Sequence, residues 1–310
     1  ILRGEEGERI DSPSVFRHGD MWYMMYAIYT KGRGYETALA ESNDLLEWRK
    51  LGRILPFRDG AWDTHQAAGY IALQDHEWGG SHKLLQHDGK YWLSYIGGDT
   101  RGYEAGRLSI GVGWTDDPSE ARSWERLDHP VLSPDQPDVR EFENDKLYKS
   151  HIIRDDSESL GFPYVMYYNA RGKYESIGMA VSDNMVDWHR YGAGPVIDNS
   201  SGISGDPQIA RIGDVWVMFY FGCGWKPDIF DTFACSYNLV SWTKWDGPHL
   251  TEPSEPWDSV TANKPWVIFH DGVVYHFYHS RCGAMDSPTE NAIAVATSKD
   301  LRADWSSSNH

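Results

Sequence analysis

The stretch DSPSVFRHGDMWYMMYA at residues 11–27, continued by ETALAESNDLLEW at residues 36–48, decides the fold. It contains a hydrophobic run, a turn centred on Gly19, an aromatic-rich run, and then a run of small residues that leads through Asn and Asp to Trp48. Because glycine accepts the positive φ that a tight hairpin turn needs, the pattern predicts three successive antiparallel strands.

The same pattern returns four times farther along the chain. Its first two runs lie at 83–96, 149–170, 206–222 and 264–280, and its small-residue run lies at 108–124, 175–188, 231–242 and 290–305 and always ends in Trp. Glycine takes the turn position in every copy except the third, where the longer connection DDSESLGFP at 155–163 replaces it. Chance does not place Trp at the end of five similar patterns, so we infer an internal repeat.

Repeats of this length that contain several short strands are too large for a solenoid coil and are typical of a propeller blade, which has four strands. The sequence therefore predicts an all-β fold, a five-bladed β-propeller with a central funnel, formed by residues 1–310 as a single domain. The blades are expected at approximately 10–55, 80–130, 145–195, 204–250 and 262–305. Only SSSNH follows Trp305, so we expect residues 1–10 to add the outer strand of the last blade.

Composition argues against several classes of partner. The formal net charge is −17, from 46 acidic and 29 basic residues, and no run is rich in Lys or Arg, so nucleic acid is not expected to bind. No apolar stretch reaches membrane-spanning length, so membrane insertion is not expected either. The 15 Trp and 18 Tyr residues exceed ordinary usage and can supply sugar-stacking surfaces as well as packing. The sequence leaves the cellular compartment open.

Potential metal ligands are sparse. Cys223, Cys235 and Cys282 have the spacing of neither a disulfide framework nor a zinc site. Asp63 and His65 lie in the Trp- and His-rich segment between the first two copies and are too few for an ordinary metal site. We therefore expect no metal ligands and no required cofactor.

The first residues of the innermost strands are the best candidates for a functional site. In an antiparallel blade the first and third strands run the same way, so the start of the innermost strand and the loop before the third strand emerge on one face. Counting back seven or eight residues from the turn glycines places Asp11, Ser12, Ser81, His82, Asp206, Lys264 and Pro265 on a ring at the mouth of the funnel, and the third copy adds Lys149 and His151.

An acidic residue also precedes each small-residue run, as Glu36, Glu104, Glu175, Asp231 and Glu290. Repeated acids at equivalent positions can accept hydrogen bonds from backbone N–H groups and hold the loops, and we assign this structural role to Glu104 and Glu290. Glu36 and Glu175 are the functional candidates, because their copies also place charged residues on the ring.

The segments DSPSVF and GDMWYMMYA in the first copy, GDPQIARIGDVWVMFYFG in the fourth, and the five endings at Trp resemble the five-bladed propeller glycoside hydrolases of family 43 and its relatives in families 32, 117 and 130. The similarity spans residues 10–305. It implies a general base at the start of the first inner strand, matched by Asp11, and a pKa-tuning Asp in mid-chain, where Asp145 stands several residues before its strand. It also implies a general acid at a later inner strand, where Asp206 replaces the family's Glu; Glu175 is the alternative acid.

The resemblance predicts an inverting, exo-acting glycoside hydrolase that removes a terminal sugar, a pentose or a uronate-decorated one, from a plant or algal oligosaccharide. Hydrolysis needs one protonated and one ionised carboxyl, and carboxylates on different blades leave the roughly 6.5–9.5 Å that an attacking water requires. The expected substrate-binding residues are Glu36, Trp62, Asp63, His65, His82, Lys149, His151, Lys264 and Trp266. Related propellers often hold calcium on the axis, so the resemblance also allows a structural calcium ion.

Two alternatives remain open. A phosphorylase of the family 130 kind would use inorganic phosphate in place of water and hold it with basic residues, although the ring lacks a clear Arg pair. A carbohydrate-binding propeller without activity is the other, since fold does not dictate function. Dependence on phosphate separates the first alternative from hydrolysis, and binding without turnover would indicate the second.

Overall fold

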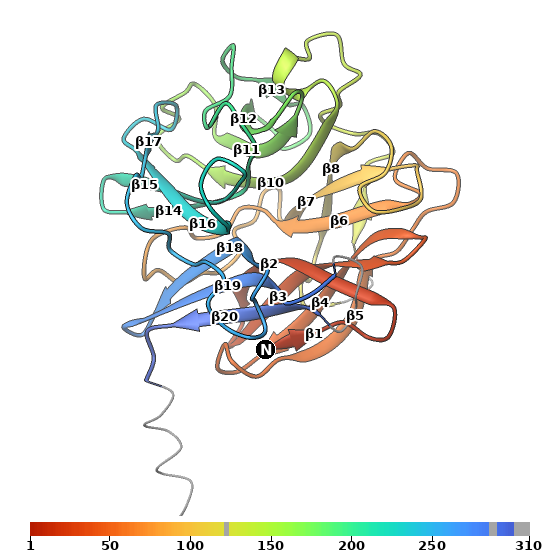
Figure 1. Ribbon diagram of the computed structural model, residues 1–310. Helices are drawn as coiled ribbons and strands as arrows, with labels where there is room; N and C mark the ends of the chain where they lie inside the picture. Colours follow the sequence, from red (N-terminus) through yellow and green to blue (C-terminus); the bar gives the residue numbers. More distant parts are fainter. Residues whose placement is uncertain (121–123, 285–289, 301–310) are drawn as a thin grey trace, which may run out of the picture.

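The computed structural model describes residues 1–120, 124–284 and 290–300 (Figure 1). Apart from the short 3-10 turn η1 (Glu141–Glu143), its regular elements are the strands β1 to β20. The predicted all-β fold is therefore confirmed. The last predicted repeat ending, at Trp305, lies outside the described residues.

The strands follow one another in five units of four, each built largely from one copy of the repeat. The first unit contains β2 (Glu8–His18), β3 (Met21–Thr30), β4 (Gly34–Ser42) and β5 (Arg49–Leu55). The second contains β6 (Gln66–Ile71), β7 (Tyr91–Gly98), β8 (Ser109–Thr115) and β9 (Glu125–Arg126). The third contains β10 (Lys146–Arg154), β11 (Tyr164–Arg171), β12 (Glu175–Ser182) and β13 (His189–Arg190). The fourth contains β14 (Ile203–Ile212), β15 (Val215–Cys223), β16 (Ile229–Ser236) and β17 (Thr243–Lys244).

The fifth unit contains β18 (Thr261–His270), β19 (Val273–Arg281) and β20 (Asn291–Thr297), and its outer strand comes from the other end of the chain. This strand is β1 (Leu2–Arg3), which pairs antiparallel with β20 through Leu2 opposite Ile293. The expectation that the first ten residues complete the last unit is thus confirmed. Figure 1 shows β1 beside β20.

The second unit begins earlier than the sequence pattern indicated. Its innermost strand is β6, which pairs antiparallel with β7, whereas residues 80–90 contribute only isolated bridges. The six residues QAAGYI of β6 are all buried and mostly small or aromatic, so they lack the hydrophobic run that marks the other innermost strands. Because the connection from β6 to β7 is long, β6 lies far from the turn at Gly89. Counting back seven or eight residues from that glycine therefore does not reach it.

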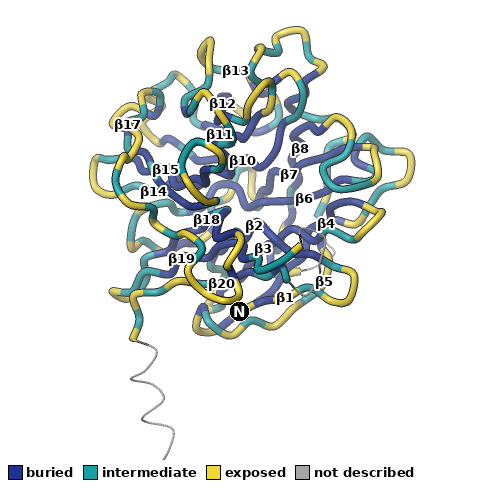
Figure 2. The backbone as a smooth tube through the Cα atoms, in the orientation of Figure 1, coloured by how far each residue is buried: buried dark blue, intermediate teal, exposed yellow. Residues whose placement is uncertain are grey.

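The innermost strands β2, β6, β10, β14 and β18 contact one another in a closed cycle, with β18 returning to β2. Large hydrophobic side chains fill the spaces between neighbouring units; one cluster joins the first, second and fifth units, another the second and third, and another the third and fourth. Figure 2 shows the buried residues on the strands and the exposed ones on the loops around them. The burial of apolar area in these clusters is the main stabilising contribution to the arrangement.

The repeated Trp has a local cause, which the first unit illustrates. Ser42 and Asp44 accept backbone N–H groups of the turn that follows β4, and the indole Nε1 of Trp48 donates to the carbonyl of Leu45 at 3.2 Å. Leu45 adopts φ of 68°, a left-handed conformation that such side-chain contacts stabilise. The third and fourth units repeat the same Trp-to-carbonyl bond.

Candidate active site

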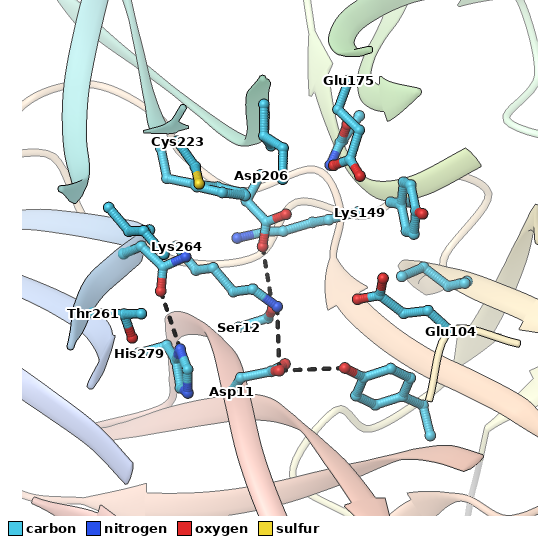
Figure 3. Close-up of a pocket in the computed structure, with 18 of the residues that line it drawn as sticks. Asp11, Ser12, Glu104, Lys149, Glu175, Asp206, Cys223, Thr261, Lys264 and His279 are labelled. Atoms are coloured by element: carbon cyan, nitrogen blue, oxygen red, sulfur yellow. Dashed lines mark hydrogen bonds and ion pairs between the residues drawn. The ribbon is translucent and has the colours of Figure 1, made fainter. Parts of the chain in front are cut away.

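A cavity of about 260 Å³ opens where the first ends of the innermost strands meet (Figure 3). Its lining combines acidic and basic side chains in equal number: Asp11, Glu104, Glu175 and Asp206 with Arg9, Lys149, Lys264 and Arg281. Tyr35, Tyr70, Tyr103 and Tyr148 contribute aromatic walls. A concave site with a few converging polar groups is the usual form of a small-molecule site.

Strand irregularities direct these side chains into the cavity. The innermost strands β2, β14 and β18 each contain a bulge at the same position, and each bulge includes a residue that precedes proline. These residues are Ser12, Asp206 and Lys264, with φ of 49°, 55° and 66°. Non-glycine residues rarely adopt such angles, and bulges with strained backbone recur beside active sites, where they re-aim side chains.

Asp11 is held in its ionised form by two cations. It is 2% exposed, and its Oδ2 accepts from Lys264 Nζ at 3.2 Å, Arg9 at 3.5 Å and Tyr35 at 3.4 Å. Burial alone would raise the pKa of Asp11, but Lys264 and Arg9 hold it well below its usual range. Among the described residues these contacts all fall on Oδ2, so Oδ1 is the oxygen that can face a ligand.

Lys149 reaches the cavity from β10 and is 1% exposed. Within the described part of the chain its Nζ has no hydrogen-bond partner and lies 5.5 Å from the centroids of the Tyr70 and Trp266 rings. Burial lowers the pKa of Lys149 to about 8, although the nearby Asp206 opposes the shift. Asp206 itself accepts from the Ser12 hydroxyl at 3.1 Å. A buried ammonium of this kind is satisfied when a ligand supplies an acceptor.

Glu175 and Glu104 differ from Asp11 because, within residues 1–120, 124–284 and 290–300, neither carboxyl has a cation in hydrogen-bond contact. Burial raises the pKa of Glu175 to about 7, and the neighbouring Glu104 adds to the shift. The amide of Asn169 donates to Glu175 Oε2 at 3.2 Å. Burial also raises the pKa of Glu104, although Lys264 opposes this. Glu175 can therefore carry a proton near neutral pH, as a general acid must.

Five of the residues expected from sequence lie together in this cavity: Asp11, Asp206, Glu175, Lys149 and Lys264. They come from four of the five units. The sequence of a single repeat copy could not have shown that these side chains converge. Figure 3 shows Asp11, Asp206 and Lys264 around one side of the cavity and Glu175 and Glu104 on the other.

The other seven expected substrate-binding residues do not line the cavity. Glu36 and Asp63 are buried in ion pairs, with Arg53 at 3.0 Å and with Arg126 at 3.0 Å. Trp62 stacks on Tyr95, and His65 lies in the segment before β6 beside Arg101.

The remaining three are packing residues near the axis or at the opposite end of the strands. His151 accepts the backbone N–H of Ile209 at 2.8 Å, and Trp266, which is fully buried, donates to the Val15 carbonyl at 3.0 Å. His82 contacts the Phe269 carbonyl through Nε2 at 3.0 Å. Because the second unit starts at β6, the ring position expected for His82 belongs to β6 instead.

Sequence reasoning missed several residues that the cavity contains. Glu104, which we expected to be structural, lies in the lining, as do Arg9, His279 and Arg281. A signal existed for Arg9, because it stands two residues from Asp11, a spacing that puts side chains on one face of a strand. Asp145, the expected pKa-tuning residue, instead pairs with Arg171 at 3.4 Å outside the cavity.

The axis does not fit a structural calcium ion. Calcium needs six to eight oxygen ligands, whereas the ammonium groups of Lys149 and Lys264 lie beside Asp206 and Asp11. Among the described residues no group of three or more His, Cys, Asp and Glu side chains has the geometry to hold a metal ion. The same part of the chain contains no helix of the length and apolarity needed to cross a membrane.

Two solved structures are similar to this chain over almost its whole length. A structure of BT0996 in complex with RGII shares 44% identity with a TM-score of 0.93 and covers 97% of this chain and 90% of its own. A structure named "Glycoside hydrolase" shares 43% identity with a TM-score of 0.92 and the same coverage. A thermostable family-43 glycoside hydrolase shares the fold at 16% identity, with a TM-score of 0.67 over 96% of this chain and 91% of its own. Neither the family models nor the curated proteins gave a match.

Proposed function

Because this chain belongs to the glycoside hydrolases, we propose that it removes one terminal sugar from an oligosaccharide by hydrolysis with inversion, using Glu175 as general acid and Asp11 as general base. One observation carries this assignment. A carboxyl that stays protonated to about pH 7 and a carboxylate held ionised by two cations line the same cavity. Glycoside hydrolysis requires this pair of protonation states.

In the proposed reaction Glu175 gives its proton to the glycosidic oxygen as the bond from that oxygen to the anomeric carbon breaks. Asp11 Oδ1 takes a proton from the water that forms the new bond on the opposite face of the sugar. The two acids come from β12 and β2, in units that are not neighbours. Placement on separate units favours the roughly 6.5–9.5 Å separation of inverting enzymes, and thus a product of inverted configuration.

The size of the cavity supports exo action. Its volume of about 260 Å³ is just below the ~300–1,000 Å³ typical of ligand sites, which suits a single sugar ring. We further propose that the five units are the blades of a five-bladed propeller and that this cavity is its central funnel. The closed cycle of contacts among the innermost strands supports that arrangement.

For the substrate we propose a terminal pentose or uronate-decorated sugar on a plant or algal oligosaccharide. The similar structure at 44% identity is a complex with RGII, so oligosaccharides of that kind are the first to try. Lys149 offers a buried, unpartnered ammonium, as far as the described residues go, to a sugar hydroxyl or carboxylate. In this scheme burial keeps Glu175 protonated, and Glu104 adds to the effect by repelling the charged form.

Phosphorolysis is the second candidate, because four cationic side chains line the cavity and can hold a phosphate. The test is product release from 4-nitrophenyl glycosides and RGII-derived oligosaccharides, with and without inorganic phosphate. Proton NMR follows the anomer that forms first. We expect water-dependent release of one sugar with inversion, and loss of activity in Asp11→Asn.

Three other outcomes are distinguishable. A requirement for phosphate would replace hydrolysis by phosphorolysis. Release with retention would exclude Asp11 as base and make Glu104, which is coupled to Glu175, the nucleophile to test. Binding without release would indicate a carbohydrate-binding protein. Asp145→Asn is the matched control, because that acid is 47% exposed and lies outside the cavity.

A further inference from the structure

A second cavity, of about 560 Å³, lies at the other end of the innermost strands from the candidate active site. The active-site cavity opens where the first ends of these strands meet. The second cavity is instead lined by Arg154, the last residue of β10, and Arg211, the next-to-last residue of β14. The two cavities share no lining residue, so the second is separate from the proposed hydrolysis.

Two connections that depart from the repeat form more than half of the lining of this cavity. In the first, fourth and fifth units only two residues join the innermost strand to the next strand. The connection from β6 to β7 and the connection from β10 to β11 are much longer, so their extra residues are not needed to close a unit. Long connections that meet on a rigid scaffold are typical of binding sites.

Buried hydrogen bonds hold the β10–β11 connection in place. Asp155 is 4% exposed, and its carboxylate accepts from the backbone N–H and hydroxyl groups of Ser157 and Ser159 at 2.6–3.1 Å. Burial alone would raise the pKa of Asp155, but these hydrogen bonds lower it. A connection fixed in this way adds little ordering cost to the binding of a ligand.

The β6–β7 connection is fixed as well. Asp75 Oδ2 accepts from the backbone N–H and hydroxyl groups of Ser81 at 2.7 Å and 2.6 Å, and these bonds lower the pKa of Asp75 although burial opposes them. The backbone N–H of Arg211 donates to the His76 carbonyl at 2.8 Å, and the Arg211 carbonyl accepts from the Trp78 N–H at 2.8 Å. The connection is therefore tied to β14.

The lining offers an aromatic face. Tyr237 is 80% exposed and follows Ser236, which pairs with Trp216 across β15 and β16. The His76 ring lies 4.9 Å from the ring of the buried Trp216 and supports the same wall. An exposed aromatic ring beside polar groups is what the apolar face of a sugar ring stacks on.

The charges of the lining indicate a neutral ligand. Two arginines are outnumbered by five acids, which are Asp75, Glu77, Asp155, Asp156 and Asp214. An anionic ligand would be repelled here, in contrast to the first cavity with its equal numbers of acids and bases. Carboxylates can accept hydrogen bonds from sugar hydroxyl groups, and the guanidinium of Arg211 can donate to their oxygens.

The second cavity lacks the acid that cleavage would need. The hydrogen bonds that lower the pKa values of Asp75 and Asp155 leave neither as a proton donor at neutral pH. We propose that the second cavity binds a neutral sugar unit of a polysaccharide without cleaving it. Attachment at this site raises the local concentration of chain ends for the active site at the other end of the strands. The inference does not depend on which acids of the first cavity are catalytic.

The test measures binding in Asp11→Asn, the variant expected to leave a polysaccharide uncleaved, by migration in native gels. The gels contain arabinan or galactan, which are neutral plant polysaccharides, or the acidic polygalacturonate. We expect a neutral polysaccharide to retard the protein and polygalacturonate not to do so. Adding Tyr237→Ala should raise the dissociation constant about tenfold, the effect of losing one stacking contact. Adding Tyr237→Phe should preserve binding, because this change keeps the ring.

The matched control adds Tyr174→Ala, because Tyr174 is also exposed, at 39%, but directly precedes β12 beside the first cavity. It should leave binding unchanged. Unchanged binding with Tyr237→Ala, or equal losses with Tyr237→Ala and Tyr174→Ala, would overturn the proposal. It would also be wrong if neither neutral polysaccharide retards the protein, or if Tyr237→Ala abolishes retardation by polygalacturonate.

Two further outcomes are separated by the design. Binding is measured without turnover, so a wild-type protein that cleaves no glycoside would refute the proposed hydrolysis and leave this test intact. Sedimentation without polysaccharide gives the oligomeric state of each variant. A dimer that Tyr237→Ala dissociates would show that the second cavity is a contact between copies, and would overturn its assignment to a sugar.

Discussion

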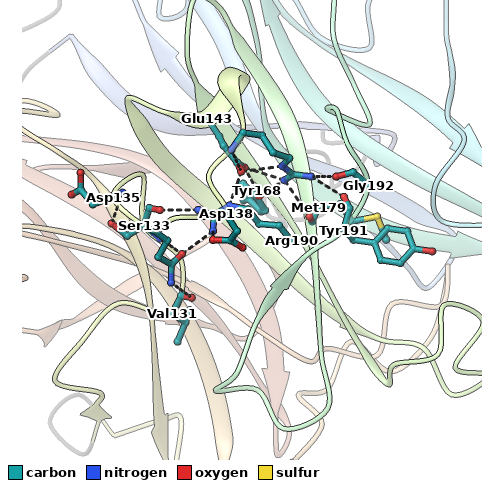
Figure 4. Close-up of polar contacts among 12 residues, drawn as sticks. Val131, Ser133, Asp135, Asp138, Glu143, Tyr168, Met179, Arg190, Tyr191 and Gly192 are labelled. Carbon is teal, nitrogen blue, oxygen red and sulfur yellow. Dashed lines mark hydrogen bonds and ion pairs between the residues drawn. The ribbon is translucent and has the colours of Figure 1, made fainter.

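Glu143, which is buried just before the third unit, and Glu175, which is half-buried within it, have surroundings that give opposite protonation states (Figures 3 and 4). Glu143 is enclosed by Arg140, Arg190 and Tyr168, and these partners lower its pKa although burial alone would raise it. Burial raises the pKa of Glu175 to about 7, and the neighbouring Glu104 adds to the shift. The carboxyl accepts a hydrogen bond from the neutral Asn169 amide. Burial sets the cost of the charge, and the partners decide whether it is compensated.

Glu143 holds neighbouring segments together, whereas Glu175 is the proposed acid of the reaction. A carboxylate with every oxygen occupied by arginine and tyrosine is rigid and has no lone pair for a substrate. Asp63 in the second unit has the same design, with Arg126, Arg58 and Tyr95 as partners. Glu175, the proposed acid, keeps its proton to about pH 7, at some expense in stability.

The largest expected effect is on turnover. Glu175→Gln removes the proton donor, so kcat for an oligosaccharide should fall about 10²- to 10⁴-fold. The loss should be smaller for a 4-nitrophenyl glycoside, because that leaving group needs less protonation. In the wild type the activity should decline as pH rises through about 7, and this limb should vanish in the variant. Initial rates over a pH series measure both, and a variant that keeps full activity would rule out Glu175 as the acid.

The next effect is on stability and concerns the other acid. Glu143→Gln removes the acidic partner of Arg140 and one of the two acidic partners of Arg190, which keeps Asp138 at 2.7 Å, and should lower the free energy of unfolding by about 3–5 kcal/mol. Denaturant titration at pH 7 measures it. Glu141→Gln is the control, because Glu141 is exposed in the same turn and should change stability by under about 0.5 kcal/mol. Equal small effects in both variants would show that the buried network contributes little.

The pH dependence of stability should distinguish the two acids by sign. The folded-state pKa of Glu175 is raised from its ordinary 4.5, so its contribution is fully present below pH 4.5 and is lost as pH rises through about 7. Glu175→Gln should therefore be more stable than the wild type above pH 7, by up to about 3 kcal/mol at 1.36 kcal/mol per pKa unit.

Glu143 has a lowered pKa, so its contribution is present above pH 4.5 and is lost as pH falls through the folded-state value. Acidification should thus reduce the excess in free energy of unfolding of the wild type over Glu143→Gln. It should also reduce the excess of Glu175→Gln over the wild type, which has the opposite sign. Unfolding curves at pH 9, pH 5 and pH 3 test both, because the Glu175 window lies between pH 4.5 and about 7 and the Glu143 window lies below pH 4.5. Parallel shifts of the two variants with pH would contradict the assignment of protonation states.

Much of the fold could be predicted because its signals are local. The turn glycine and the Trp that bonds to a carbonyl three residues earlier act within one copy, so each copy carries its own evidence. The innermost strand of the second unit escaped because QAAGYI depends on its neighbours for burial and has no signal of its own.

The site was predictable only where one strand carries the signal. Asp11, Asp206 and Lys264 lie at or next to the residue before proline in three bulges, so the repeat exposes them. Glu104 and Glu175 occupy equivalent positions with three other acids, and only packing decides that these two reach the cavity. Asp63 was expected to bind sugar because it lies in a Trp- and His-rich segment. Its carboxylate instead pairs with Arg58, which precedes it in the chain, and Arg126, which follows it.

The smallest expected effect is on stability and concerns the fourth unit. Lys244 stands there at the position of Arg190, the arginine that pairs with Glu143 in the third unit. The residue two positions after the repeated Trp is Arg190 in the third unit and Lys244 in the fourth, and Lys244 meets the neutral amide of Asn199 at 3.0 Å in place of an acid. Lys244 is exposed, so Lys244→Ala should lower the free energy of unfolding by less than about 1 kcal/mol. Denaturant titration beside Glu143→Gln measures the contrast. A loss as large as that of Glu143→Gln would mean that the contact between units, and not the buried charge, stabilises this position, because Lys244 bonds to the segment that crosses from the third unit to the fourth.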